Sequence, residues 1–323
     1  VKSCTKDNGL FISICVKERG VMGESRRRQL LTATQQTSAM IGVTGGLWPL
    51  SNTTAQYELE NWFIQRGMEP SMPGLHDTLA FLQAEQRDSR ALNQVARLVE
   101  ARSYTADELS EAERKIRVAA QAIANRVTRD QRQGLCVVAS GVLSRMLDEL
   151  GVWNYTAKSS LTIHFPRSVS PEPRYFYSID HGQFVAPHAI VVAPPFAVVD
   201  VTVKHQFYDE DAMGQWLPST LMTKETRPYQ VTSMELVSPS VRAELRKHGM
   251  TIERYLAQEK SDMLELMRHL PSREVIFDDG RLAYGVVAVG GYQERLRDLH
   301  GANCSIDGLT PIEIYERDVL PKL

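Results

Sequence analysis

The sequence predicts an α+β fold in which helices come before and after an antiparallel sheet. Residues 54–150 repeat apolar side chains at the spacing of amphipathic helices. Residues 155–203 are instead rich in β-branched and aromatic residues and are divided by turn signals, which indicates a meander of strands. A run of helices followed by a meander is the α+β order, because parallel sheets require strands and helices to alternate.

The helical part contains several separate patterns. Residues 54–67, 75–102, 105–127 and 135–150 each place apolar residues on one side of a helix. Thr105 is a good N-cap, and Glu108 three residues later completes a capping box. The most regular apolar side belongs to residues 135–150, which Gly151 ends. Cys136 therefore falls in the first turn of that helix.

The strands follow from residue 155. We expect the first strand at residues 155–165, and Asp180-His181-Gly182 is a hairpin signal. Pro194-Pro195 then turns the chain into the apolar run FAVVDVTV. Further along, we expect helices at 238–247 and 251–270, a hairpin turning at 279–280, and a last helix at 291–300.

Composition narrows the function classes. The chain has 323 residues, of which 43% are hydrophobic and 24% are charged, with a formal net charge of −2. This is ordinary globular composition, and no block of basic residues favours a nucleic-acid partner. No stretch of about 18 uncharged apolar residues occurs, so we expect no membrane span.

The cysteines do not form a metal-binding pattern. They are Cys4, Cys15, Cys136 and Cys304, and none belongs to a CxxC pair or lies near a histidine at metal-ligand spacing. The sequence also lacks a calcium loop of the DxDxDG type. We therefore expect neither a metal nor another cofactor.

The first 55 residues have features of a leader. Residue 1 is Val, and Met22 is a natural alternative start. Three arginines, Arg26 to Arg28, precede Gln29-Leu30-Leu31 and a moderately apolar stretch, which resembles the paired-arginine core of a twin-arginine export signal. Thr53-Thr54-Ala55 is a rough match to a cleavage site. We expect an exported, periplasmic protein, with an amphipathic segment of a cytoplasmic protein as the alternative.

These patterns suggest a division of the chain. Residues 1–55 are the expected leader, and residues 56–130 the N-terminal helical segment. Residues 131–232 are the expected catalytic core, and residues 233–323 a C-terminal extension of helices and a hairpin.

Three residues could form a nucleophilic site. The N–H groups and positive pole of a helix N-terminus favour the thiolate of Cys136 and can stabilise an oxyanion. His188 opens one strand, and Asp200 lies on the next strand across the Pro-Pro turn. With the turn near 194–195, His188 and Asp200 fall roughly opposite each other and share a face of the sheet. A thiol, an imidazole and an orienting carboxylate are the parts of a cysteine nucleophile.

The motifs around these residues resemble a known family. Cysteine at a helix start, H-A-φ-V-V on one strand (φ is apolar) and D-x-T on the next are similar to the transglutaminase-like group of papain-like cysteine enzymes. The matching residues are Gly134 and Cys136 in QGLC, His188-Ala189 in HAIVV, and Asp200 and Thr202 in DVT. The resemblance covers about residues 130 to 205. It departs from the family at Val137, after His188-Ala189 and at Val201, where aromatic residues or proline are usual.

The resemblance implies a papain-like, transglutaminase-type core with Cys136 as nucleophile, His188 as general base and acid, and Asp200 as the orienting carboxylate. Gln133 would donate to the oxyanion, as a glutamine before the cysteine does in papain relatives. The implied reaction is acyl transfer from a protein or peptide amide through a thioester at Cys136, with water or an amine as acceptor.

Other interpretations use the same residues. A cysteine on an apolar helix can be an inert core residue, and the fold can serve as a catalytically inactive binding module. An arylamine N-acetyltransferase-type enzyme shares the triad. His164, on the preceding strand, and His181, in a turn, are the other histidines considered for the site.

Overall fold

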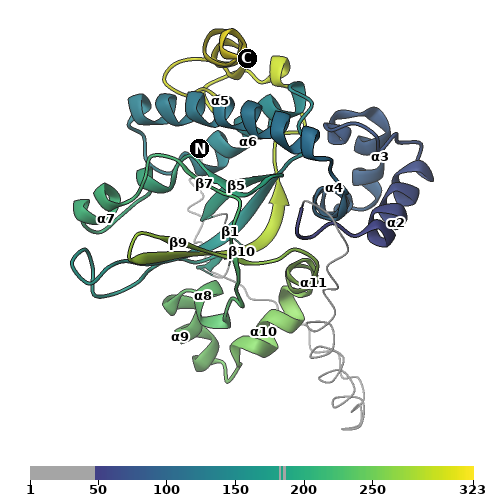
Figure 1. The fold of residues 1–323 in the computed structure, drawn as a ribbon. Coiled ribbons are helices and arrows are strands. Elements are labelled where there is room, and N and C mark those ends of the chain that lie inside the picture. The colour runs from purple at the N-terminus through teal and green to yellow at the C-terminus, as the bar shows by residue number, and fades with distance from the viewer. Residues whose placement is uncertain (1–47, 182, 185–186) are drawn as a thin grey trace, which may run out of the picture. The chain divides into compact units, whose positions relative to one another are not determined.

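The computed structural model describes residues 48–181, 183–184 and 187–323. Met22, the arginines of the expected export signal, Cys4 and Cys15 lie outside the described residues. The described residues, from Trp48 onward, form one unit. It combines helices with an antiparallel sheet, which confirms the predicted α+β class (Figure 1).

The main sheet has the strand order β7-β6-β5-β1-β10-β9-β8, and β2 pairs with β1 beside it. All of these pairs are antiparallel. A separate hairpin, β3 and β4, follows β2 along the chain. The strands are β1 (Tyr155–His164), β2 (Arg174–Phe176), β3 (Ile179–Asp180), β4 (Gln183–Phe184), β5 (His188–Ala193), β6 (Phe196–Asp200), β7 (Leu221–Thr223), β8 (Arg227–Pro228), β9 (Arg273–Phe277) and β10 (Gly280–Gly290).

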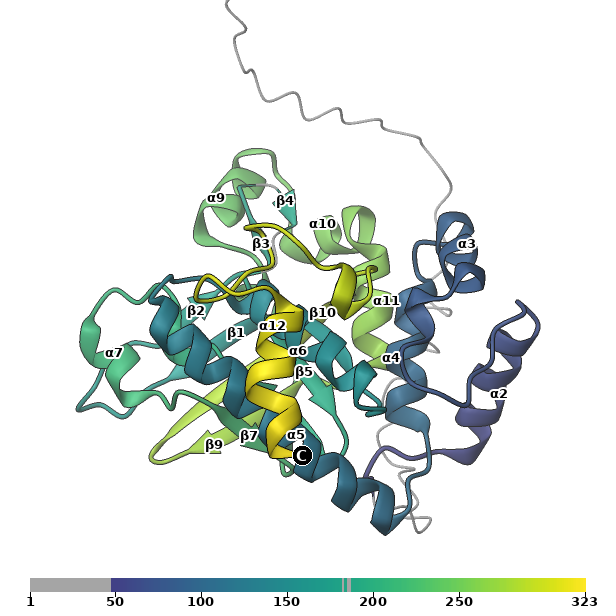
Figure 2. The same ribbon diagram turned by 90° about the horizontal axis from the view of Figure 1, so that it is seen from above.

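One face of the sheet is covered by α5 (Ala106–Asp130) and α6 (Cys136–Glu149) (Figure 1). Val142 and Leu143 of α6 belong to the same apolar cluster as Val191 of β5 and Val199 of β6. The C-terminal elements are α12 (Pro311–Ile314), η4 (Tyr315–Val319) and η5 (Leu320–Lys322), and they cross α5 on its outer side, with η4 in contact with it (Figure 2). Burial of this apolar layer seats α6 on the sheet.

The helices before α5 pack on the other face of the sheet. Phe63 and Leu98 share an apolar cluster with Leu161 of β1 and Ile190 of β5. A third cluster joins the later helices to Val287 of β10. The elements concerned are α2 (Thr53–Ile64), η1 (Leu75–Asp77), α3 (Leu79–Arg87), α4 (Ala91–Ala101), α8 (Ser233–Leu236), α9 (Pro239–Lys247), α10 (Ile252–Glu259) and α11 (Ser261–His269).

Some elements differ from the sequence predictions. The single helix expected at 75–102 is divided into η1, α3 and α4, and the helix expected at 251–270 is divided at Lys260, whose φ of −133° is not helical. The last helix expected at 291–300 is wrong, because only the short turn η3 (Leu296–Asp298) forms there. Two further short elements, η2 (Val203–His205) and α7 (Asp211–Trp216), follow β6.

The segment 233–323, expected to be a C-terminal extension, is not separate from the expected core in the structure. β9 and β10 belong to the segment 233–323, yet β10 lies between β1 and β9 in the main sheet. The segment is therefore part of the sheet that carries His188 and Asp200. Among the described helices, none is long and apolar enough to cross a membrane.

The fold begins upstream of residue 55. Trp48 is buried and its indole N–H donates to the carbonyl oxygen of Glu100 at 3.1 Å. Asn52 caps α2 by accepting from the amide of Ala55 at 2.9 Å. Thr53, Thr54 and Ala55 form the first turn of α2, so cleavage at that point would remove the cap and Trp48. The predicted leader boundary at residue 55 thus falls inside the folded unit.

A buried ion pair joins α4 to the sheet. Glu100 and Arg273 are 5% and 2% exposed, and an Arg273 Nη2 group donates to Oε1 of Glu100. The Tyr155 hydroxyl donates to the same oxygen at 2.6 Å. Arg273 also donates to the carbonyl oxygen of Ala197 at 2.9 Å. Two donors therefore compensate part of the desolvation of this carboxylate, both at Oε1, whereas the buried Oε2 has no hydrogen-bond partner among the described residues.

We expect Glu100→Leu to destabilise the protein strongly, since it leaves the Arg273 charge buried without its partner. The expected loss is about 3–5 kcal/mol of unfolding free energy in urea denaturation at neutral pH. The matched variant carries Glu100→Leu together with Arg273→Met and should recover most of that loss. A single variant as stable as the double variant would contradict a net role for the pair.

Candidate active site

His188 and Asp200 form a buried pair at the ends of neighbouring strands. His188 is the first residue of β5, and Asp200 is the last residue of β6. His188 Nε2 lies 2.5 Å from Asp200 Oδ2, and both residues are fully buried. The Pro194-Pro195 peptide bond in the turn between the strands is cis. The predicted hydrogen bond between the two side chains is present.

A β-bulge puts the pair on one face of the sheet. Ala193 pairs with Phe196, but Val191 pairs with Val199, so the register shifts by one residue between them. Continued without the shift, the hairpin would set Asp200 opposite Ala189, whose side chain points to the other face. With the shift, Asp200 lies opposite Ile190 and diagonal to His188. The two residues are thus diagonal neighbours, whereas the sequence predicted that they lie roughly opposite each other.

Asp200 is held by several donors. Its Oδ1 accepts from the Thr202 amide at 3.0 Å and from the Thr202 hydroxyl at 3.3 Å. Its Oδ2 accepts from the Tyr284 hydroxyl at 3.0 Å as well as from His188. A fully buried carboxylate needs such partners, because it has lost its hydration. Thr202 of the D-x-T motif therefore fixes the carboxylate.

Cys136 begins α6, as predicted. Its Sγ lies 3.9 Å from the carbonyl oxygen of Pro187, the residue directly before His188, and only 3% of Cys136 is exposed. The second ring nitrogen of His188, Nδ1, has no hydrogen-bond partner among the described residues. The Cys136 thiol is close enough to the imidazole to contribute to its pKa. The structure therefore brings Cys136, His188 and Asp200 together.

The electrostatics of the site favour a charged imidazole. Burial lowers the pKa of His188, but the charge of Asp200, the hydrogen bond to it and the neighbouring Cys136 outweigh burial and raise the pKa to about 10. The imidazole is then protonated at neutral pH. An imidazolium next to a thiol favours the thiolate.

The start of α6 is shaped by Gly134. This residue has a φ of +73°, and its amide donates to the carbonyl oxygen of His205 at 3.2 Å. The positive φ favours glycine here, and a Cβ would lie 2.9 Å from the ring of Phe207, which would have to move. The first N–H groups of a helix have no acceptor within it and point toward its N-terminus. They can therefore stabilise negative charge that forms beside Cys136.

The remaining residues considered from the sequence lie elsewhere. Gln133 is solvent-exposed in the turn before Gly134, and its oxyanion role stays a prediction. His164 ends β1 beside Arg281, with 3.4 Å between their nitrogens, and His181 is exposed and 3.7 Å from Asp180. Cys304 is buried, and burial raises its pKa. Among the described residues, no group of His, Cys, Asp and Glu side chains could hold a metal ion.

Sequence reasoning missed Tyr284. It lies on β10, in the segment that the sequence suggested was an extension, and no local motif marks it. Its ring centre is 6.0 Å from that of His188. The ring centre of Phe176, on β2, is 6.5 Å from that of His188. Only the pairing of β10 with β1 brings Tyr284 to the site.

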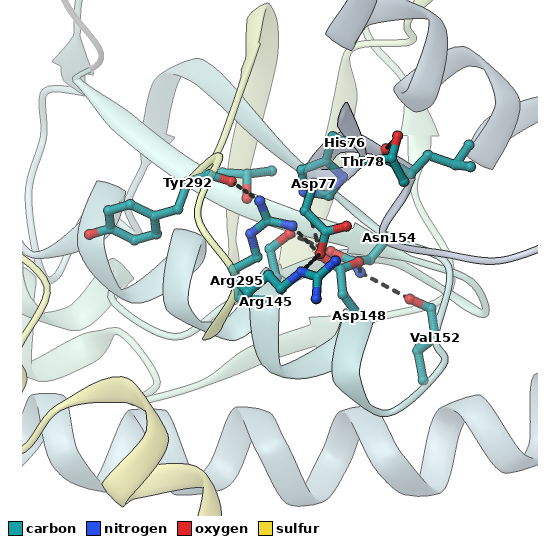
Figure 3. A network of polar contacts seen from close by, with 12 residues as sticks. His76, Asp77, Thr78, Arg145, Asp148, Val152, Asn154, Tyr292 and Arg295 are labelled. Atoms are coloured by element: carbon teal, nitrogen blue, oxygen red, sulfur yellow. Dashed lines mark hydrogen bonds and ion pairs between the residues drawn. The ribbon is translucent and has the colours of Figure 1, made fainter. Parts of the chain in front are cut away.

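The far end of α6 is held by a polar network (Figure 3). Asp148 accepts from Asn154 at 2.9 Å and lies 3.2 Å from Arg145, which also donates to the Tyr292 carbonyl oxygen. His76 of η1 lies 3.5 Å from Asp148. Burial and the charge of Arg145 lower the pKa of His76 to about 3, so its ring is neutral at pH 7 and this contact is no ion pair. Burial raises the pKa of Asp148 to about 7, although Arg145 opposes this shift.

Comparison with known proteins adds no relative. No family model matches the chain, and neither a curated protein nor a solved structure matches it. The functional argument therefore depends on the geometry of the site.

We expect the His188–Asp200 pair to make stability depend on pH in the alkaline range. A pKa raised from 6.5 to about 10 contributes stability that is complete below pH 6.5 and is lost as the pH rises through 10. The difference in unfolding free energy between the wild type and His188→Asn should therefore be largest near pH 6 and decrease toward pH 10. Urea denaturation at a series of pH values measures it.

His164→Asn is the control, because burial and the charge of Arg281 lower the pKa of His164. Its contribution changes as the pH falls below 6.5 and stays constant above it. A difference for His188→Asn that does not change between pH 6 and 10 would contradict the raised pKa.

Proposed function

We propose that this protein is a cysteine enzyme that transfers acyl groups through a thioester at Cys136, on a papain-like, transglutaminase-type core. The proposal rests on one observation above the others. A fully buried His188–Asp200 hydrogen bond lies beside a cysteine at a helix N-terminus. This is the arrangement that activates a thiol and can return a proton to a leaving group.

In the proposed first step, the Cys136 thiolate attacks the carbonyl carbon of an amide. The carbonyl oxygen takes up the negative charge near the first N–H groups of α6. The C–N bond then breaks, and the leaving amine takes the proton from His188 Nδ1, which is the ring nitrogen free of Asp200. The products of this step are an acyl thioester on Cys136, a free amine and a neutral imidazole.

In the second step, His188 removes a proton from water or from an amine, which attacks the thioester carbonyl. The Cys136 thiolate leaves and the imidazolium is restored. With water the protein is a protease, amidase or deamidase, and with an amine it is a cross-linking transglutaminase. Asp200 keeps the imidazole oriented through both steps, because its second oxygen is anchored to Thr202.

One observation favours a second candidate function, a binding module that does not catalyse. Cys136 is 3% exposed and His188 is fully buried, so the reacting atoms are covered in this conformation. A nucleophile must reach its substrate within van der Waals contact, which a permanently closed site would prevent. Reagent access to Cys136 separates the two candidates.

We expect Cys136 to react rapidly with iodoacetamide near pH 6, where an ordinary thiol is almost fully protonated. The experiment uses the full chain with Cys4→Ser, Cys15→Ser and Cys304→Ser, so that one thiol remains. Its alkylation rate, followed by intact mass, should exceed that of free cysteine by at least about tenfold. The added change His188→Asn should remove the advantage.

The controls distinguish the outcomes. Adding Cys136→Ser should abolish labelling, and circular dichroism checks that each variant is folded. Labelling no faster than free cysteine, and unaffected by His188→Asn, would overturn the enzyme proposal. Labelling that occurs only after unfolding in urea supports the binding module.

Export to the periplasm is the localisation that we propose. Because Trp48 and the cap of α2 belong to the fold, a processed chain should begin upstream of Trp48. N-terminal sequencing of the protein from a periplasmic extract measures this. A mature chain that starts at residue 55 or later would contradict the expected start upstream of Trp48. A cytoplasmic protein that retains Met22 would contradict export.

A further inference from the structure

Tyr284 reaches the site from a distant strand. In the sheet, β10 is separated from β6 by β1 and β5, yet the Tyr284 hydroxyl donates to Asp200 Oδ2 at 3.0 Å. Tyr284 and Asp200 are both fully buried. The oxygen that accepts this bond is the same oxygen that accepts from His188.

The phenol can act only as a donor in this position. Burial and the charge of Asp200 hold the pKa of Tyr284 well above its usual value, so the hydroxyl stays protonated. An ionised carboxylate has no proton to give. The hydroxyl and the imidazole therefore compete for the charge of one oxygen atom.

We propose that Tyr284 is a positioning residue for the reaction at Cys136, because its hydroxyl shares Asp200 Oδ2 with His188 and limits how tightly Asp200 holds the imidazolium proton. The inference rests on the proposed function and deepens it. Two donors on one carboxylate oxygen spread its charge, so each bond is weaker than it would be alone.

This sharing matters for proton transfer. His188 must give its proton to the leaving amine in the first step and take a proton from the acceptor in the second. A general acid and base works best when its pKa is near the working pH. A carboxylate that interacts only with the imidazole would raise the pKa of His188 further and make the imidazolium a weaker acid.

The chain offers a matched control in Tyr155. Its hydroxyl also donates to a buried carboxylate, that of Glu100, at 2.6 Å, and Tyr155 is 3% exposed on β1. Tyr155→Phe and Tyr284→Phe each remove one buried hydroxyl from one carboxylate. A role that is only structural predicts similar effects of the two variants on the site.

The experiment measures the alkylation rate of Cys136 by iodoacetate from pH 5 to 10.5, in the full chain with Cys4, Cys15 and Cys304 changed to Ser. Iodoacetate is an anion, so its rate falls when the neighbouring imidazolium loses its charge. For Tyr284→Phe we expect this alkaline fall to move upward by about half a pH unit or more. For Tyr155→Phe we expect no movement.

A second variant keeps the test decisive if Tyr284→Phe does not fold. Incorporation of 3-fluorotyrosine at position 284 preserves the hydroxyl and makes it a stronger donor, so the alkaline fall should move to lower pH. Unchanged pH profiles for a folded Tyr284→Phe protein and for the fluorotyrosine protein would overturn the inference about Tyr284. An equal shift for Tyr155→Phe would do the same. Both outcomes would leave the proposed function standing. If the wild type shows no alkaline fall, the proposed function and this inference are both overturned.

Discussion

The buried pair of His188 and Asp200 is the constraint on which the rest of the site depends. An ionised carboxylate with no exposed surface is stable only if donors replace its water, and the fold supplies them from three places. Thr202 follows directly along the chain, His188 comes from the neighbouring strand, and Tyr284 comes from β10. The Asp200 carboxylate therefore depends on the position of β10, which supplies one of its donors. A change that moves this strand would leave a buried charge with fewer partners.

The same face of the sheet carries a second buried charge pair. Tyr284 of β10 lies opposite Arg273 of β9 in the strand register, and Arg273 bonds Glu100 of α4. Asp200 and Glu100 each accept a tyrosine hydroxyl in addition to their cationic or histidine partner. In the first pair Asp200 orients His188 beside a thiol, whereas in the second pair the bond between Glu100 and Arg273 attaches α4 to the sheet. The two pairs differ in their neighbours, because the Cys136 thiol lies beside His188 of the first pair.

Much of the fold and of the candidate site could be predicted from local sequence patterns. The α+β order, the helix at 135–150 and the hairpin at Pro194-Pro195 follow from periodicity and turn residues, and these place Cys136, His188 and Asp200 close together. Long-range pairing could not be read in this way. The bulge between Val191 and Ala193, which sets the shared face, has no signature in the sequence. The insertion of β10 beside β1 is equally non-local, so Tyr284 was missed and the last segment was described as an extension.

The two ends of helix α6 make different contacts. Its N-terminus carries Cys136 and N–H groups that favour negative charge, whereas near its C-terminal end Arg145 donates to the Tyr292 carbonyl oxygen and Asp148 accepts from Asn154. Cys136 moves with α6, so a slide of the helix along the sheet would separate its sulfur from His188 and leave only the positive pole of the helix beside the thiol. The apolar contacts of Val142 and Leu143 resist separation from the sheet but define the axial position less sharply. Directional bonds supply that remaining restraint: the Ser140 hydroxyl donates to the Ala189 carbonyl oxygen of β5 at 2.9 Å, and Arg145 donates to the Tyr292 carbonyl oxygen. Hydrogen bonds weaken steeply when their geometry changes.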